Sequence, residues 1–240
     1  MEIITHRPIF LLFDWLRGAP GVTAASVTIS FFAVAMVIFV TLPIHEYAHA
    51  FSAKILGDDT AERQGRLTLN PFAHIDPVGA LILLMVPFGW AKPVPVNPVR
   101  CRKVKARTAV VIISAAGPLS NIVLAYIVMI ITKITLLNAD LGNEMLYYII
   151  MALYLIIQIN VYIAIFNLLP VPPLDGSKIL FIFLKPKWMY KMMEHQQIIS
   201  IVFLVLLFIQ GSPLRWLLER LSFYMLNGLD FLSGFILRLF

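Results

Sequence analysis

Long runs of apolar residues constrain the fold of this chain more than any other feature. Three segments, at about 24–53, 108–132 and 145–169, are each long enough to cross a bilayer as a helix, which takes roughly 20 mostly apolar residues. The second and third contain no charged residue. Every backbone polar group in lipid needs an internal partner, so such segments form helices. The sequence therefore predicts an all-α polytopic integral membrane protein.

The composition agrees with a membrane protein. Of the 240 residues, 60% are hydrophobic and 13% are charged, whereas soluble domains have about 45–50% apolar and about 25% charged residues. The net charge of +6 does not indicate nucleic-acid binding, because excess Lys and Arg in a membrane protein mark cytoplasmic loops. We expect the lipid bilayer as a partner and no nucleic acid. No polar stretch is long enough for a second domain, so residues 1–240 are expected to form one membrane-embedded unit.

The basic residues predict the orientation of the spans. Between residues 91 and 107 there are six cations and no acid, whereas the connection at 133–144 has one Lys and two acids. This asymmetry places 91–107 in the cytoplasm and 133–144 outside. Three further lysines place the 185–195 loop in the cytoplasm. The nine cytoplasmic cations are Lys92, Arg100, Arg102, Lys103, Lys105, Arg107, Lys185, Lys187 and Lys191.

Three shorter segments complete the predicted topology. Residues 78–90 are too few to span comfortably and precede a proline-rich stretch, so we expect a re-entrant or interfacial segment there. With that return, the first span runs inward, 108–132 outward and 145–169 inward. Residues 197–210 form a short but plausible fourth span, and 221–240 form either another span or an interfacial helix.

Two histidines and a glutamate lie inside the first predicted span. His45-Glu46-Tyr47-Ala48-His49 matches the pattern H-E-x-x-H. Histidines four residues apart share one face of a helix, so both imidazoles can reach one ion. Glu46 is then placed to take a proton from water that a zinc ion activates. The alternative is a hydrogen-bonded polar group within a helix bundle, but three ionisable side chains in an apolar helix are expensive and indicate function.

A catalytic zinc usually has a third protein ligand, and four residues are candidates. These are Asp175, His74, Glu62 and Asp76. Asp175 follows a cluster of prolines that breaks a long apolar helix, and irregular backbone at membrane depth is tolerated where it lines a cavity. The alternatives are that Asp175 is an ordinary turn residue and that His74 is only hydrogen-bonded within its loop. Residue chemistry alone favours Asp175 over His74 and leaves both possible.

Five motifs in order carry a family resemblance. They are HEYAHA (45–50), GRLTLNPFAHIDPVG (65–79), GWAKPVPVNP (89–98), AAGPLSN (115–121) and NLLPVPPLDG (167–176). From about residue 30 to about 180 the chain resembles the site-2 protease family of intramembrane zinc metalloproteases, in particular its compact bacterial and archaeal branch. The resemblance implies that His45, His49 and Asp175 bind one Zn²⁺ and that Glu46 activates water. It thus selects Asp175 over His74.

The resemblance also implies substrate-binding residues and an architecture. Asn167 corresponds to an asparagine near the scissile peptide, although it could instead cap the broken helix. Asn121 is a second candidate, with the alternative that its motif only lets two helices pack closely through Gly117. The family fold has a three-helix catalytic core, here at about 24–180, with extended segments near 63–70 and 94–97 on the cytoplasmic side that could pair with an unwound substrate. Residues 181–240 would form a helical C-terminal extension, and no segment corresponds to the PDZ or CBS domains of some relatives.

We therefore expect a hydrolase, a zinc metalloendopeptidase of the cell membrane. It would cleave membrane proteins in or near their transmembrane helices, in regulated intramembrane proteolysis, with its active site towards the cytoplasm. A second class of membrane zincins uses a downstream glutamate as third ligand, but no helical E-x-x-x-D pattern is present. A non-proteolytic metal-binding or transport protein is the alternative outside hydrolases. It would need further ionisable residues in the later spans, whose main polar residues are Asn121, Gln158 and Asn160.

Overall fold

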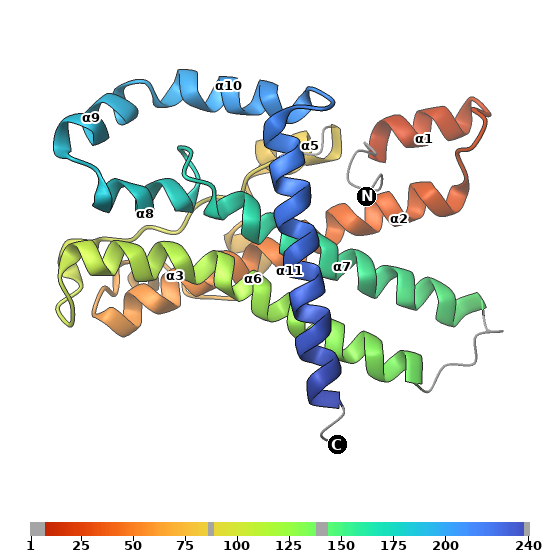
Figure 1. The fold of residues 1–240 in the computed structure, drawn as a ribbon, viewed down its shortest axis with the longest axis horizontal. Coiled ribbons are helices and arrows are strands. Elements are labelled where there is room, and N and C mark those ends of the chain that lie inside the picture. The colour runs from red at the N-terminus through yellow and green to blue at the C-terminus, as the bar shows by residue number, and fades with distance from the viewer. Residues whose placement is uncertain (1–7, 86–88, 138–143, 238–240) are drawn as a thin grey trace.

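The computed structural model describes residues 8–85, 89–137 and 144–237, which are mainly helical. The helical segments at 24–56 and 106–137 run along the long axis of the molecule, whereas the helix at 213–237 runs across it (Figure 1). Three of the described helices are long and apolar enough to cross a membrane, namely Ala24–Leu56, Ala106–Leu137 and Leu146–Leu168. They coincide with the three predicted spans. The chain is therefore a multi-pass, all-α membrane protein, as predicted.

The first span is one continuous helix with a local change of pitch. It consists of α2 (Ala24–Met36), a π-helical turn (Val37–Thr41) and α3 (Leu42–Leu56). Pro43 cannot donate a backbone hydrogen bond to the preceding turn, and a wider π-turn accommodates such a defect. The defect lies directly before His45. The helix ends at Gly57, whose φ of 108° is left-handed and suits glycine.

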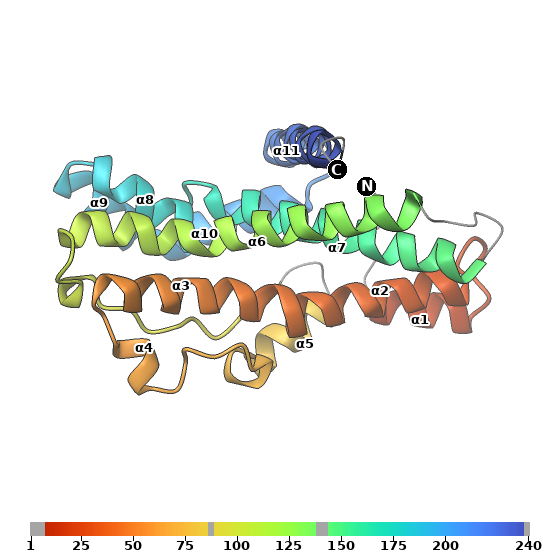
Figure 2. The ribbon, with the colours of Figure 1, turned by 90° about the horizontal axis from the view of Figure 1, so that it is seen from below.

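Two further spans pack beside the first. α6 (Ala106–Leu137) contacts both α3 and α7 (Glu144–Leu168), while α1 (Pro8–Leu16) lies against α2 at the far end. Figure 2 shows α2 and α3 in one layer, with α6 and α7 above it. Ala109 and Gly117 are buried on α6, and such small residues let membrane helices approach closely. The three-span arrangement brings the middle of α6 against the H-E-x-x-H segment.

The connection between α3 and α6 consists of short helices and turns that are joined by irregular backbone. It contains α4 (Thr60–Arg63), α5 (Pro77–Met85) and two 3₁₀ turns, Pro71–Ala73 and Pro98–Arg100. α5 is too short to cross a membrane alone. The expected re-entrant path of residues 78–90 remains a prediction, and residues 86–88 lie outside the described part. Within the described ranges there is no regular strand, only an isolated bridge between Ile75 and Ala91. Residues 94–97, expected to be extended, have no regular structure.

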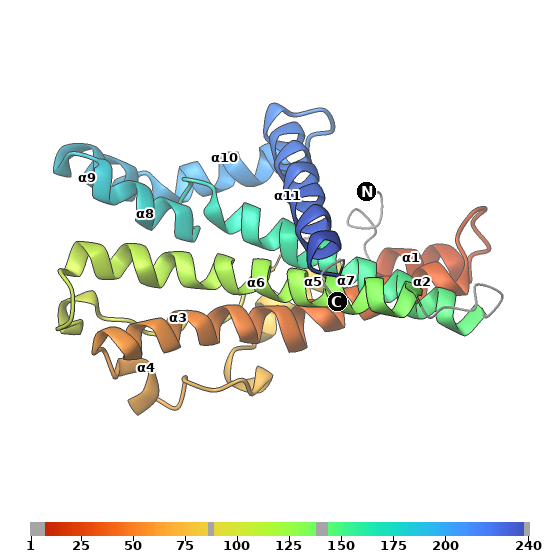
Figure 3. The same cartoon turned by 60° about the horizontal axis from the view of Figure 1, so that its bottom comes forward.

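Between α7 and residue 237, where the described part ends, the chain forms four helices. They are α8 (Asp175–Phe183), α9 (Pro186–Glu194), α10 (Gln196–Phe208) and α11 (Pro213–Leu237). α9 and α10 meet at a bend of 68° and reach the length of a span only together. The helix expected at 221–240 begins earlier, at Pro213. It runs across α6 and α7 in Figures 1 and 3, and is seen nearly end-on in Figure 2.

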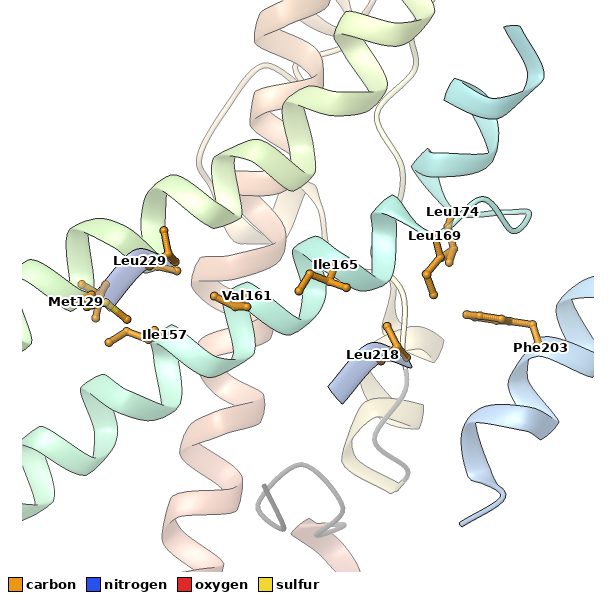
Figure 4. Packing of buried hydrophobic residues seen from close by; sticks show 11 residues of the cluster. Met129, Ile157, Val161, Ile165, Leu169, Leu174, Phe203, Leu218 and Leu229 are labelled. Carbon is orange, nitrogen blue, oxygen red and sulfur yellow. The ribbon is translucent and has the colours of Figure 1, made fainter. Parts of the chain in front are cut away.

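One apolar cluster joins the C-terminal helices to the spans. Figure 4 shows Phe203 of α10 and Leu218 and Leu229 of α11 packed towards buried side chains of α6 and α7. In lipid such contacts stabilise through van der Waals packing and not by removing apolar surface from water. Lys133 of α6 adds an ion pair with Asp230 of α11, at 2.9 Å. These contacts fix the C-terminal helices to α7, the helix that leads to Asp175.

Candidate metal centre

The structure brings His45, His49 and Asp175 together in the protein interior. The two histidines come from successive turns of α3, and Asp175 is the first residue of α8. The Oδ2 atom of Asp175 lies 3.2 Å from Nε2 of His45 and 3.0 Å from Nε2 of His49, and the two Nε2 atoms are 3.0 Å apart. All three side chains are buried. In the described part of the chain, no other group of three such side chains converges in this way.

Broken backbone after α7 makes this approach of Asp175 possible. The turn that follows Leu168 contains Pro170, Pro172 and Pro173, which end the helix, and α8 begins at Asp175. Gly176 then lies tightly against the end of α7. A Cβ atom at Gly176 would be 2.5 Å from the carbonyl oxygen of Leu169 and closer still to that of Leu168. Only glycine permits α8 to start where its first side chain reaches α3.

The outer nitrogen of each imidazole has a hydrogen-bond partner on α6. His49 Nδ1 donates to the carbonyl oxygen of Ile113, at 2.6 Å, and His45 Nδ1 donates to Oδ1 of Asn121, at 3.1 Å. A carbonyl oxygen can only accept, so Nδ1 carries the proton in each ring. In the neutral rings the two Nε2 atoms are then unprotonated and present their lone pairs to Asp175. Such outer partners are the usual means of fixing the tautomer of a metal-binding histidine.

The site fits a divalent metal ion. Two lone pairs and a carboxylate oxygen repel one another at about 3 Å unless a cation lies between them. Ligands about 2.0–2.1 Å from a tetrahedral zinc are about 3.3 Å apart, close to the 3.0–3.2 Å separations here. Gly117 leaves the space beside both rings open, because a Cβ atom there would be 2.6 Å from His45 Nε2 and closer still to His49 Nε2. Two nitrogens and one oxygen are a donor set that suits zinc.

Glu46 lies beside this group and is held by the backbone of the 92–98 segment. Its Oε2 accepts a hydrogen bond from the N–H of Val94, at 2.9 Å. Val94 lies between Pro93 and Pro95, which have no N–H, so it is the one backbone donor of that tripeptide. Among the described residues, Oε1 of Glu46 has no hydrogen-bond partner. The carboxylate is oriented through one oxygen and has the other available for proton transfer.

A large cavity opens onto the site. It has a volume of about 1110 Å³ and is lined mainly by apolar side chains of α2, α3, α6, α7, α8 and α10, together with His45, Glu46, His49 and Asp175. The size and lining suit a peptide segment with apolar side chains. The ionic side chains on its wall outside the site are Arg107, Lys178, Arg215 and Glu219.

The two asparagines expected to bind substrate lie in different surroundings. Asn167 lines the cavity, and its Nδ2 donates to the carbonyl oxygen of Ile163 one turn earlier in α7. Asn121 is fully buried and contacts His45. The position of Asn167 suits contact with a peptide in the cavity, and that of Asn121 suits support of the histidine.

The other candidates for a third ligand have different partners. His74 Nε2 donates to the carbonyl oxygen of Thr68, at 2.8 Å. Asp76 accepts from the N–H of Gly79 at the start of α5, and Glu62 pairs with Lys54. Of the four candidates, only Asp175 is brought to the two histidines.

Several contacts at the site are not apparent from the motifs. Lys178 of α8 lies with Nζ 2.8 Å from Oδ1 of Asp175. Its signal in the sequence is a basic residue one helical turn after an acidic one. The carbonyl of Ile113 and the N–H of Val94 are backbone groups, so no side chain indicates them. Gly117 is expected in a close helix contact, but its place beside the histidines depends on how α3 and α6 pack.

Comparisons with known proteins agree with this chemistry. A profile described as Peptidase family M50 matches residues 134–210, a range that contains Asp175. A Bacillus subtilis (strain 168) protein named "Putative zinc metalloprotease YwhC" is 44% identical over 184 residues, or 75% of this chain and 82% of that protein.

Two mycobacterial proteins are similar over more of the chain. A protein of Mycolicibacterium smegmatis named "Putative zinc metalloprotease Rip2" is 30% identical over 235 residues, or 93% of this chain and 88% of that protein. Its namesake in Mycobacterium tuberculosis (strain H37Rv) is 30% identical over 229 residues, or 90% of this chain and 85% of that protein. No solved structure gives a significant match.

Proposed function

This chain belongs to peptidase family M50 and is a metalloprotease, and from this premise we propose that it cleaves membrane proteins within or beside their transmembrane helices. The observation that carries the proposal is the position of His45, His49 and Asp175, which converge where membrane-spanning helices meet a large apolar cavity. A protease for soluble substrates has no need of such surroundings. We further propose that residues 1–240 act as one unit, with its catalytic core at about 24–180.

Zinc is the cofactor, and His45, His49 and Asp175 would hold one ion per chain. When bound, zinc polarises the scissile carbonyl and makes water a stronger nucleophile near neutral pH. The fixed Nδ1 protons leave both Nε2 lone pairs to face Asp175, where they would bind the ion. Asn121 and the Ile113 carbonyl therefore support the two histidines.

Glu46 is the general base. Its free Oε1 takes a proton from the attacking water, while the Val94 N–H holds Oε2 and fixes the plane of the carboxylate. The water oxygen bonds to the carbonyl carbon of the scissile peptide, and the C–N bond breaks. Glu46 then passes its proton to the leaving amine nitrogen, so that the carboxylate is regenerated.

The substrate is a transmembrane segment of another membrane protein. A helix shields its carbonyl groups through internal hydrogen bonds, so the segment unwinds before water can attack it. Asn167 lies on the cavity wall and can hydrogen-bond an exposed peptide group of the unwound segment. Residues 94–97 have no regular structure, and Val94 and Val96 line the same cavity, so the carbonyl groups of this stretch can accept hydrogen bonds from an extended substrate.

We place the active site towards the cytoplasm of a cell membrane. The basic segments 100–107 and 185–191 lie at the same end of the molecule, where α3 ends and α6 begins (Figures 1 and 3). Excess Lys and Arg favour the cytoplasmic side of a membrane protein. Water then reaches Glu46 from that side, and regulated release of cytoplasmic fragments becomes the physiological output.

The test is cleavage of a panel of tagged single-span substrates by the purified full chain in proteoliposomes. Glu46→Gln and Asp175→Asn should both abolish cleavage, since the first removes the base and the second removes the charge of the third ligand. Glu62→Gln is the matched control, because Glu62 pairs with Lys54 away from the site. Wild-type cleavage rates in both site variants would refute the mechanism. Zinc uptake into the vesicles without any cleavage would support a transport protein instead.

A further inference from the structure

We propose that Lys178 is a positioning residue: it holds one oxygen of Asp175 so that the carboxylate offers only its other oxygen to the metal. The inference rests on the proposed function of the site. Asp175 and Lys178 are three residues apart on α8 and therefore lie on one face of that helix. Lys178 Nζ donates to Oδ1 of Asp175, at 2.8 Å.

The two oxygens of Asp175 have different partners. Oδ2 lies 3.0–3.2 Å from the Nε2 atoms of His49 and His45. Oδ1 lies beside the ammonium group of Lys178 and has no second hydrogen-bond partner among the described residues. Each oxygen is therefore committed to one direction, and rotation of the carboxylate would break the contact with Lys178.

Burial makes this contact consequential. The side chain of Asp175 is 7% exposed, so without Lys178 its Oδ1 would be left largely desolvated and without a partner. The side chain of Lys178 is 52% exposed and lines the same cavity as the metal site. The ion pair therefore joins a half-exposed cation to a buried carboxylate and balances its charge.

The basic residues next in the chain provide a contrast. Lys185, Lys187 and Lys191 lie after the end of α8, and among the described residues none of them forms an ion pair. Lys187 and Lys191 lie on α9, and all three follow the preference of basic residues for the cytoplasmic side. Lys178 alone of these four lysines contacts a residue of the metal centre.

Loss of Lys178 would change the metal site in one of two ways. Oδ1 could turn to the ion and make Asp175 a two-oxygen ligand, or the unpartnered carboxylate could rotate away and leave two histidines. Both changes alter the coordination of the metal, and both weaken a geometry suited to four ligands. Loss of an outer partner of a ligand typically costs about 10–100-fold in metal affinity.

The experiment compares Lys178→Met, Lys178→Arg and the control Lys185→Met in the purified full chain. Zinc affinity is measured by competition with a chromophoric chelator, and the visible absorption of the Co²⁺-substituted protein reports coordination number and geometry. We expect Lys178→Met to bind zinc about 10–100-fold more weakly, with an altered Co²⁺ spectrum. Lys178→Arg should restore both properties, because a guanidinium can donate to the same oxygen. Lys185→Met should match the wild type.

Unchanged zinc affinity together with an unchanged Co²⁺ spectrum in Lys178→Met would overturn the inference. The inference would also be overturned if Lys178→Arg restored neither the zinc affinity nor the Co²⁺ spectrum. A general loss of packing would then explain the weaker binding of Lys178→Met. If Lys178→Met does not yield folded protein, Lys178→Gln replaces it in the same comparison. Asp175→Ala separates this inference from the proposed function. Zinc retained by Asp175→Ala would refute the ligand assignment itself. Zinc lost in Asp175→Ala, with unchanged zinc affinity and an unchanged Co²⁺ spectrum in Lys178→Met, would refute the role of Lys178 alone.

Discussion

Gly117→Ala should destroy the metal centre although it adds only one methyl group. The added Cβ would lie 2.6 Å from His45 Nε2 and nearer still to His49 Nε2, whereas ordinary van der Waals contact begins at 3.4 Å. The rings cannot move aside freely, because the Ile113 carbonyl and Asn121 hold their Nδ1 atoms. Either the methyl group takes the space beside the two nitrogens, or the rings rotate and their outer hydrogen bonds break.

We expect zinc affinity to fall at least about 100-fold, the upper end of the effect of losing an outer-shell partner. That loss equals about 2.8 kcal/mol, at about 1.4 kcal/mol for each factor of ten. Alanine is the better helix former by about 0.5–1 kcal/mol, so poor helix formation in α6 cannot explain the loss. The assay is zinc content after dialysis against a graded chelator series, together with substrate cleavage.

Gly228→Ala is the matched control. Gly228 also lies within a helix, α11, and no heavy atom would come within 4 Å of its added Cβ. This variant should bind zinc and cleave like the wild type. If Gly117→Ala binds zinc with wild-type affinity and cleaves substrate, α6 does not pack against the histidines as described. The proposed fit of a metal ion between His45 and His49 would then also be wrong.

Three further predictions test other parts of the account. Asn121→Ala should weaken zinc binding about 10–100-fold in chelator competition because His45 loses its Nδ1 partner, and unchanged affinity would exclude that role. Burial raises the pKa of the Cys101 thiol, so less thiolate is present at a given pH. Maleimide should therefore label the native protein slowly at pH 7 and faster as the pH rises or after denaturation, and fast native labelling would contradict the burial. Phe203→Ala should lower the thermal unfolding midpoint in detergent, since it removes the contact of α10 with Phe166. Large-to-small core changes of this kind lower the free energy of unfolding by about 3–5 kcal/mol in soluble proteins. An unchanged midpoint would show that α10 does not pack there.

The spans and the first two candidate ligands were predictable from the sequence for simple physical reasons. Hydrophobic length alone marks a membrane helix, so the segments at 24–53, 108–132 and 145–169 needed no tertiary information. The spacing of His45 and His49 places both side chains on one helical face regardless of the fold.

Asp175 required more than local pattern. It lies 126 residues after His49, so residue chemistry could only rank it by its place at a broken helix. The family resemblance selected it, and the structure brings it to within 3.2 Å of both histidines. The C-terminal helices could not be predicted in the same way. α11 carries charged residues, and its course across α6 and α7 depends on side-chain packing with partners far away in the sequence.

Backbone partners were beyond prediction because they have no residue signature. The carbonyl of Ile113 holds His49, and the N–H of Val94 holds Glu46. Any residue other than proline offers such groups, so only the packing of α6 and of the 92–98 segment against α3 identifies which ones act.

The central claim is that three side chains hold one zinc ion while Glu46 moves protons without binding it. The most direct measurement is the zinc content per chain of Glu46→Gln against Asp175→Ala, after removal of loosely bound metal. The account predicts one zinc per chain in Glu46→Gln, as in the wild type, and almost none in Asp175→Ala. Equal zinc content in the two variants would contradict it.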